Sequence, residues 1–196
     1  MFLFFNAQLT SESKKVTFSR EESKHITKVL RKKTGDQLQI TNGNGNLFVA
    51  KISNDNPNKC EALIEHFQFF EKSNFYTHIA IAPTKNNDRL EWFLEKATEI
   101  GIDEITPIIC KNSERKTVKS ERLVKIMISA MKQSMDYYLP KLNNAIDFND
   151  FIQKTYNCKK FIAHCENSKK SSFFETINKK ESILILIGPE LSLIHI

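Results

Sequence analysis

The stretch SILILIGPE, residues 182–190, places five consecutive apolar residues directly before a glycine. An apolar run of this length, bounded by a turn signal, is typical of a buried strand. Gly188 can turn the backbone sharply where that strand ends, and it leaves room for a ligand there. The stretch therefore predicts a sheet domain with a functional edge at the Gly188-Pro189-Glu190 turn.

Upstream of this stretch, apolar strands alternate with amphipathic helices from Tyr76 onward. This order predicts an α/β domain with a mostly parallel sheet and helices on its faces, in which ligands bind at the carboxyl ends of strands. The expected strands are 78–82, 104–109, 160–165 and 182–187, and the expected helices are 88–100, 120–135 and 171–178.

Residues 1–71 have a different pattern, in which short strands surround one helix. Ser19 and Glu22 form a capping box that opens the helix, and Gly35 is expected to close it. Asn42-Gly43-Asn44-Gly45 is a strong hairpin signal. We therefore expect a small β-barrel with strands at 1–5, 36–41, 47–52 and 61–67.

Composition restricts the class of protein. The formal net charge of +6 suits a polyanionic partner such as nucleic acid, although a lysine-rich surface gives the same value. The four cysteines form no CxxC pair, so neither a zinc site nor a disulfide framework is indicated. The same spacing, with no other metal-ligand pattern in the sequence, leads us to expect no bound metal. No signal peptide and no apolar run of about eighteen residues are found, so a cytoplasmic protein is expected.

Basic residues cluster in three places that could bind phosphates. His25, Lys28, Arg31 and Lys32 lie on or beside one face of the first helix, which could equally be a solvated face with cations near a helix C-terminus. Lys85 and Arg89 lie where a strand leads into a helix, a position that an ordinary helix cap also explains. Arg115 lies in the basic segment SERKTVK, residues 113–119, which could be a plain polar loop.

Other tempting motifs carry less weight. His164-Cys165-Glu166 lies at a strand end, but no orienting acid marks it as a catalytic thiol site. Gly43 and Gly45 lack the spacing of a phosphate loop. His66 and His78 are expected to be ordinary strand residues.

An ordered set of segments resembles the RsmE family, the uridine-N3 methyltransferases of 16S ribosomal RNA. The first two segments are SKHITKVLRKKTGD at 23–36 and NGNG at 42–45. They are followed, in the family's order, by PTK at 83–85, EKATEIG at 95–101, ITP at 105–107, AMKQS at 130–134, LP at 139–140 and IGPE at 187–190.

The resemblance implies a PUA-like RNA-binding barrel over 1–71 and a SPOUT methyltransferase domain over 75–190. It also implies a C-terminal trefoil knot that binds S-adenosylmethionine, a homodimer, and methyl transfer to N3 of a uridine in 16S ribosomal RNA of the small subunit. It gives no catalytic base. The implied cofactor-binding residues are Leu186, Ile187, Gly188, Pro189, Glu190, His164, Cys165 and Glu166. The RNA-contact candidates, chosen from charge and placement, are His25, Arg31, Lys32, Lys85, Arg89 and Arg115.

Residues 191–196 depart from the family pattern, which continues with a second glycine-rich step and the rest of the knot. We therefore expect a non-native tail, an incomplete knot, and weak or absent activity. The alternative function is that of a non-enzymatic RNA-binding protein. A different α/β enzyme with a nucleotide cofactor would carry a glycine-rich fingerprint, which the sequence lacks.

Overall fold

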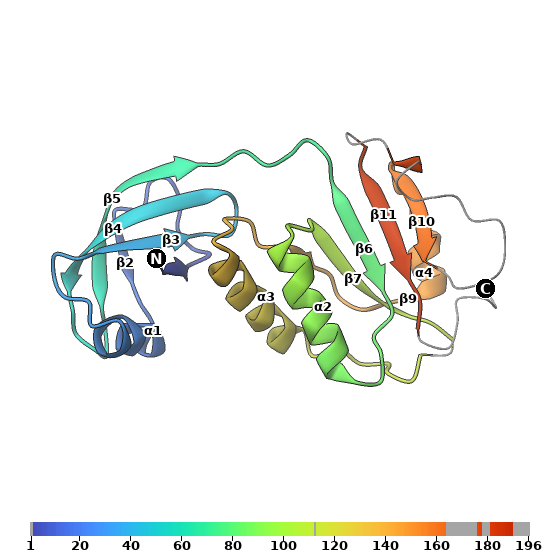
Figure 1. The fold of residues 1–196 in the computed structure, drawn as a ribbon, viewed down its shortest axis with the longest axis horizontal. Helices are drawn as coiled ribbons and strands as arrows, with labels where there is room; N and C mark the ends of the chain where they lie inside the picture. The colour runs from blue at the N-terminus through green and yellow to red at the C-terminus, as the bar shows by residue number, and fades with distance from the viewer. Residues whose placement is uncertain (1, 112, 164–175, 178–180, 190–196) are drawn as a thin grey trace. The chain divides into compact units, whose positions relative to one another are not determined.

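The computed structural model describes residues 2–111, 113–163, 176–177 and 181–189 (Figure 1). The chain divides into two compact units. The first unit comprises Met1–Lys72 and Met131–Leu139, and the second comprises Ser73–Ala130 and Pro140–Ile196. The expected helix at 171–178 falls almost wholly outside the described residues, and the expected tail at 191–196 falls outside them entirely.

The first unit is built on a curled sheet. Its described strands are β1 (Leu3–Phe5), β2 (Lys15–Thr17), β3 (Gln37–Thr41), β4 (Asn46–Asn54) and β5 (Glu61–Phe69), in the order β1-β3-β4-β5-β2. Figure 1 shows the curl of this sheet. Phe4, Ile40 and Phe48 are buried together in the apolar core of the unit. The expected small barrel is therefore confirmed as a half-barrel, and the hairpin forms at Asn42–Gly45 as predicted. The short strand β2 was not predicted.

The helix of the first unit begins as expected and ends earlier. α1 (Arg20–Lys24) starts where the Ser19 hydroxyl accepts a hydrogen bond from the Glu22 amide at 3.2 Å, and it continues as one π-helical turn, η1 (His25–Val29). Arg31 then takes the left-handed conformation, with φ of 55°, and the Lys32 amide donates to the Ile26 carbonyl. The prediction that Gly35 ends the helix was wrong, because Arg31 fills that role.

The second unit contains a parallel sheet. Its described strands are β6 (Thr77–Ile81), β7 (Glu104–Ile109), β8 (Lys141–Leu142), β9 (Ile146–Asp147), β10 (Lys159–Ala163) and β11 (Ile183–Ile187). The order is β10-β11-β6-β7-β8, with β9 also paired to β7, and every one of these pairings is parallel. The predicted α/β architecture is confirmed, and the strand predicted at 182–187 forms β11, an interior strand between β10 and β6.

Helices cover both faces of this sheet. Figure 1 shows α2 (Asn87–Glu99) and α3 (Ser120–Ser134) on one side and α4 (Phe148–Ile152) on the other. Phe148 and Phe151 of α4 pack with Ala80 and Leu186 in one apolar cluster. Gly101, with φ of 81°, ends α2 as predicted. In the described part of the chain, we find no helix with the length and apolarity that crossing a membrane requires.

Candidate cofactor and RNA sites

The sheet of the second unit has a topological switch point between β6 and β11. From β6 the chain proceeds to β7 on one side, whereas it reaches β11 from β10 on the other side. The Ala82 amide donates a hydrogen bond to the Ile187 carbonyl at 2.8 Å, so the two strands remain paired to their carboxyl ends. Open α/β sheets bind ligands in the crevice beyond such a point.

Small residues directly follow two of the strands at this edge. Ala163 of β10 is paired with Ile187 of β11, which is paired with Ile81 of β6. Gly188 and Ala82 come next on their strands, so no large side chain stands at either of these positions. A glycine and an alanine at these positions allow a ligand to approach the backbone closely.

The predicted cofactor residues divide into two groups. Leu186 is buried and packs in the core of the sheet, whereas Ile187, Gly188 and Pro189 are half-buried at the strand end. Among the candidates that the structure describes, these three are the ones at the strand end. The remaining predicted residues, His164, Cys165, Glu166 and Glu190, lie outside the described residues.

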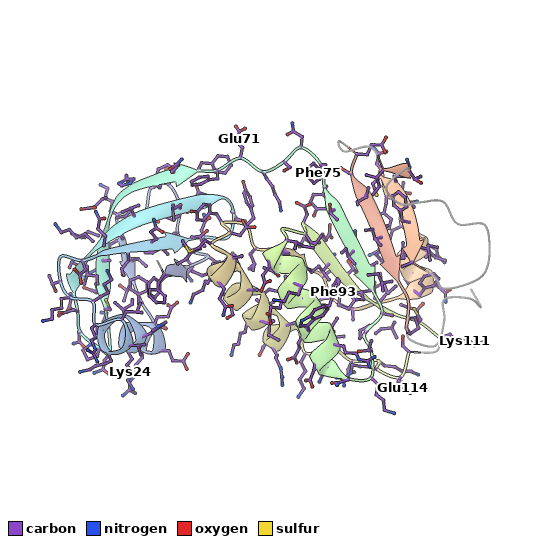
Figure 2. All side chains as sticks on the ribbon, in the orientation of Figure 1. Lys24, Glu71, Phe75, Phe93, Lys111 and Glu114 are labelled. Carbon is purple, nitrogen blue, oxygen red and sulfur yellow. The ribbon has the colours of Figure 1, made fainter. Side chains whose placement is uncertain are left out.

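Three of the RNA-contact candidates gather at the same edge. Arg115 donates from Nη2 to the Lys85 carbonyl oxygen at 2.8 Å, and Lys85 Nζ lies 3.5 Å from Glu114 Oε2. Figure 2 shows Lys111 and Glu114 on the segment after β7, at the end of the sheet where β6 also ends. Arg89 lies in the first turn of α2, directly after the Lys85 loop.

The other three candidates belong to the first unit. The His25 ring lies 6.3 Å from the rings of both Phe2 and Phe4. Lys32 and the same two phenylalanines line a cavity of about 490 Å³. The left-handed Arg31 directly precedes Lys32 and is exposed. His25 and Lys32 are therefore brought to one place, beside a cavity that the sequence did not predict.

Sequence reasoning also missed a buried polar network in the second unit. His78 Nε2 lies 2.7 Å from Thr106 Oγ1, and Asn143 donates to both Thr106 and Glu104. The Tyr76 hydroxyl donates to Glu104 at 2.8 Å, and Lys141 Nζ lies 3.2 Å from the same carboxylate. A histidine within an apolar strand was the only sequence signal, because Asn143 is remote in the chain.

This network changes the ionisation of its members. Burial lowers the pKa of His78, which is only 5% exposed, and Lys141 adds to this effect against the opposing influence of Glu104. Burial alone would raise the pKa of Glu104, but the hydrogen bonds from Asn143 and Tyr76 outweigh it and the pKa is lowered. The site therefore holds a neutral imidazole above an ionised carboxylate. Among the described residues, no group of three or more His, Cys, Asp or Glu side chains could hold a metal ion.

Comparison with known proteins finds a matching family model for each of the two units. Residues 71–193 match a family model described as an RNA methyltransferase domain, and residues 18–65 match one described as an RNA methyltransferase PUA domain. Ribosomal RNA small subunit methyltransferase E of Rickettsia conorii is 28% identical over 191 residues, which are 96% of this chain and 77% of that protein. The protein of the same name from Bacillus subtilis is 27% identical over 203 residues, covering 96% of this chain and 79% of its own length.

Solved structures give the same result. The crystal structure of a probable rRNA-methyltransferase from Porphyromonas gingivalis superposes with a TM-score of 0.89 at 34% identity, covering 98% of this chain and 81% of that one. Ribosomal RNA small subunit methyltransferase E from Neisseria gonorrhoeae, bound to S-adenosyl methionine, gives a TM-score of 0.83 at 21% identity, with 98% of this chain and 81% of that chain covered. This second likeness supports the fold alone.

Proposed function

The chain belongs to the RsmE family of ribosomal RNA methyltransferases, and on that premise we propose that it methylates N3 of a uridine in 16S ribosomal RNA. S-adenosylmethionine is the proposed methyl donor. The observation that carries the proposal is the family match over residues 71–193, which include the Gly188 turn beside the switch point of the sheet.

The proposed role of the second unit is to position the reactants. The bound cofactor would supply an electrophilic methyl group. Backbone groups of Ile187, Gly188 and Pro189 would hold it, with Glu190, His164, Cys165 and Glu166 as further candidates. A deprotonated uridine N3 needs mainly correct alignment with that methyl group, and such alignment can supply a large part of a rate enhancement.

The proposed RNA contacts form one set in each unit. Lys85, Arg89 and Arg115 would bind phosphates near the cofactor edge, and His25, Arg31 and Lys32 would bind RNA at the half-barrel. We accordingly propose that residues 1–71 bind RNA and residues 75–190 carry the transfer. A homodimer and a cytoplasmic location complete the proposal.

A methyl-transfer assay on unmethylated small ribosomal subunits tests the function. Tritiated S-adenosylmethionine is the donor, and mass spectrometry of nuclease fragments locates the new methyl group. Gly188→Val fills the space at the strand end and should reduce transfer by about 100-fold, the order expected for misplaced reactants. Ile183→Val, at the opposite end of β11, is the matched control and should keep its activity.

The outcomes separate the rival functions. Methylation of a ribose, or of a base atom other than uridine N3, contradicts the proposed reaction. RNA binding without any methyl transfer by the unaltered chain favours a non-enzymatic RNA-binding protein. The expectation of weak activity stays a prediction, and calorimetry with S-adenosylmethionine measures it directly: micromolar affinity would contradict it.

A further inference from the structure

We propose that the cavity of the first unit binds one unpaired nucleotide of the RNA, with its base against Phe2 and its edge read by Gln39. The proposal rests on the proposed function and deepens it, because it gives the half-barrel a base-specific role beyond phosphate binding.

The cavity extends across strands β1, β3, β4 and β5 of the curled sheet. Gln39, Val49 and His66 are register partners on β3, β4 and β5, so their side chains form one row across the sheet. Phe2 precedes β1, and Leu30 and Lys32 follow the π-helical turn. The cavity measures about 490 Å³, and its lining is Phe2, Phe4, Leu30, Lys32, Gln37, Leu38, Gln39, Val49 and His66.

Gln39 supplies an unused hydrogen-bonding group in this lining. Its Oε1 atom is buried and has no hydrogen-bond partner among the described residues. The neighbouring Gln37, in contrast, donates from Nε2 to Glu65 Oε2 at 3.0 Å. Because a buried acceptor without a partner is unfavourable, a ligand N–H that reaches Gln39 stabilises the bound state. The N3–H group of an unpaired uracil has this chemistry.

Phe2 supplies a stacking surface. Its side chain is 58% exposed, whereas Phe4 behind it is 2% exposed and belongs to the core. A large exposed aromatic side chain beside a cavity suits a base, since stacking of one base on an aromatic ring contributes about 1–3 kcal/mol to the binding of single-stranded RNA.

Two lysines lie beside the same aromatic residues. Lys32 lines the cavity, and Lys132 Nζ lies 5.6 Å from the Phe4 ring centroid. The His25 ring contacts Phe2 and Phe4 edge-on. These lysines would not contribute to the binding of an apolar small molecule. They would attract the phosphates that flank an unpaired base in RNA. The cavity of about 460 Å³ in the second unit is different, because the Glu104 carboxylate on its wall already has hydrogen-bond partners in Tyr76 and Asn143.

Fluorescence anisotropy with the full chain tests the proposal. The probes are labelled oligouridylates, intact or with a single abasic position moved along the strand. We expect one abasic position to weaken binding by about tenfold, the order of one stacked base.

Phe2→Ala should weaken binding of the intact probe similarly and abolish the abasic effect. Gln39→Met, which keeps the volume but removes the amide, should reduce the preference for uridylate over cytidylate.

Controls make the result decisive. Phe69→Ala removes an exposed ring that does not line the cavity and should leave binding unchanged. If Phe2→Ala unfolds the unit, Gln39→Met still provides the readout. Equal binding of intact and abasic probes overturns the inference, and so does competition by free uridine monophosphate at the affinity of the oligonucleotide. If the abasic effect is absent while the small subunits are still methylated, only this inference fails.

Discussion

Gly45 has the least room for a side chain among the glycines of the half-barrel hairpin. Its φ is +84°, and an added Cβ would lie 2.8 Å from the Phe70 carbonyl oxygen and closer still to the Tyr138 ring. Gly45→Ala should therefore destabilise the protein by more than Gly35→Ala, which has φ of +98° but nothing within 4 Å. We expect about 1–2 kcal/mol for Gly35→Ala, from backbone strain alone, and clearly more for Gly45→Ala. Equal losses in urea unfolding would refute the steric explanation.

Arg31 offers a way to separate stability from RNA binding. A left-handed non-glycine residue costs about 1 kcal/mol or more, and Arg31 occupies this conformation with φ of 55°. Arg31→Gly should raise the free energy of unfolding and at the same time weaken RNA binding. Thermal unfolding and anisotropy measure the two effects. Unchanged affinity for RNA would remove Arg31 from the contact set.

The His78–Glu104 network predicts acid sensitivity. The lowered pKa of His78 means that the unfolded chain takes up the proton first, so stability is lost as pH falls below about 6.5 toward the folded pKa. The lowered pKa of Glu104 acts in the same direction below about 4.5. His78→Gln should remove the loss of stability that begins near pH 6.5 and should keep the loss that Glu104 causes below about pH 4.5. Chemical unfolding at a series of pH values measures it, and an unchanged profile would show that His78 is not responsible.

At the scale of elements, α2 is held by one face only. Leu94 is fully buried, whereas Trp92, two residues earlier, is 63% exposed. Leu94→Ala should destabilise the protein by about 2–5 kcal/mol, because it leaves a cavity in a packed core. Trp92→Ala is the control and should change stability by about 0.5 kcal/mol or less. A large loss for Trp92→Ala would indicate that another surface covers it.

Elements with strong local signals could be predicted from the sequence. The hairpin of β3 and β4, the helix α2 with its Gly101 stop, and the interior strand β11 all have a clear turn or apolar pattern. β2 could not be predicted, because three residues with one buried side chain carry no periodicity. The π-helical turn at His25–Val29 also has no local signature, because its apolar spacing of Ile26 and Val29 is that of an ordinary α-helix.

The candidate sites follow the same rule. The turn at Gly188 consists of consecutive residues that directly follow an apolar strand, so its position at the sheet edge could be predicted. The cavity beside Phe2 could not, because its lining comes from five segments that meet only in the folded unit. The partnership of Asn143 with Glu104 is likewise a product of tertiary structure.

At the scale of the whole molecule, the net charge of +6 should appear in the salt dependence of RNA binding. Arg31→Glu and Arg89→Glu should each weaken binding and reduce the slope of log affinity against log salt by about one phosphate. Anisotropy over a salt series measures the slopes. An unchanged slope for either variant excludes that residue as a phosphate contact.

The first unit is completed by a distant part of the chain. The Gly45 amide donates to the Tyr137 carbonyl at 2.9 Å, and the Tyr138 hydroxyl donates to the Phe70 carbonyl at 2.6 Å. Residues 131–139 therefore belong to the half-barrel, although the methyltransferase strands β6 and β7 lie between them and Lys72 in the chain. The half-barrel consequently depends on residues that come late in the sequence.

The position of β11 between β10 and β6 has a consequence for biosynthesis. β6 pairs on one side with β11, which leaves the translating ribosome long after it. At ~5–20 residues per second, roughly 5–20 s separate the two strands during translation. For that time the β6 edge of the nascent polypeptide has no strand partner in β11, so it is exposed to aggregation and to chaperone capture.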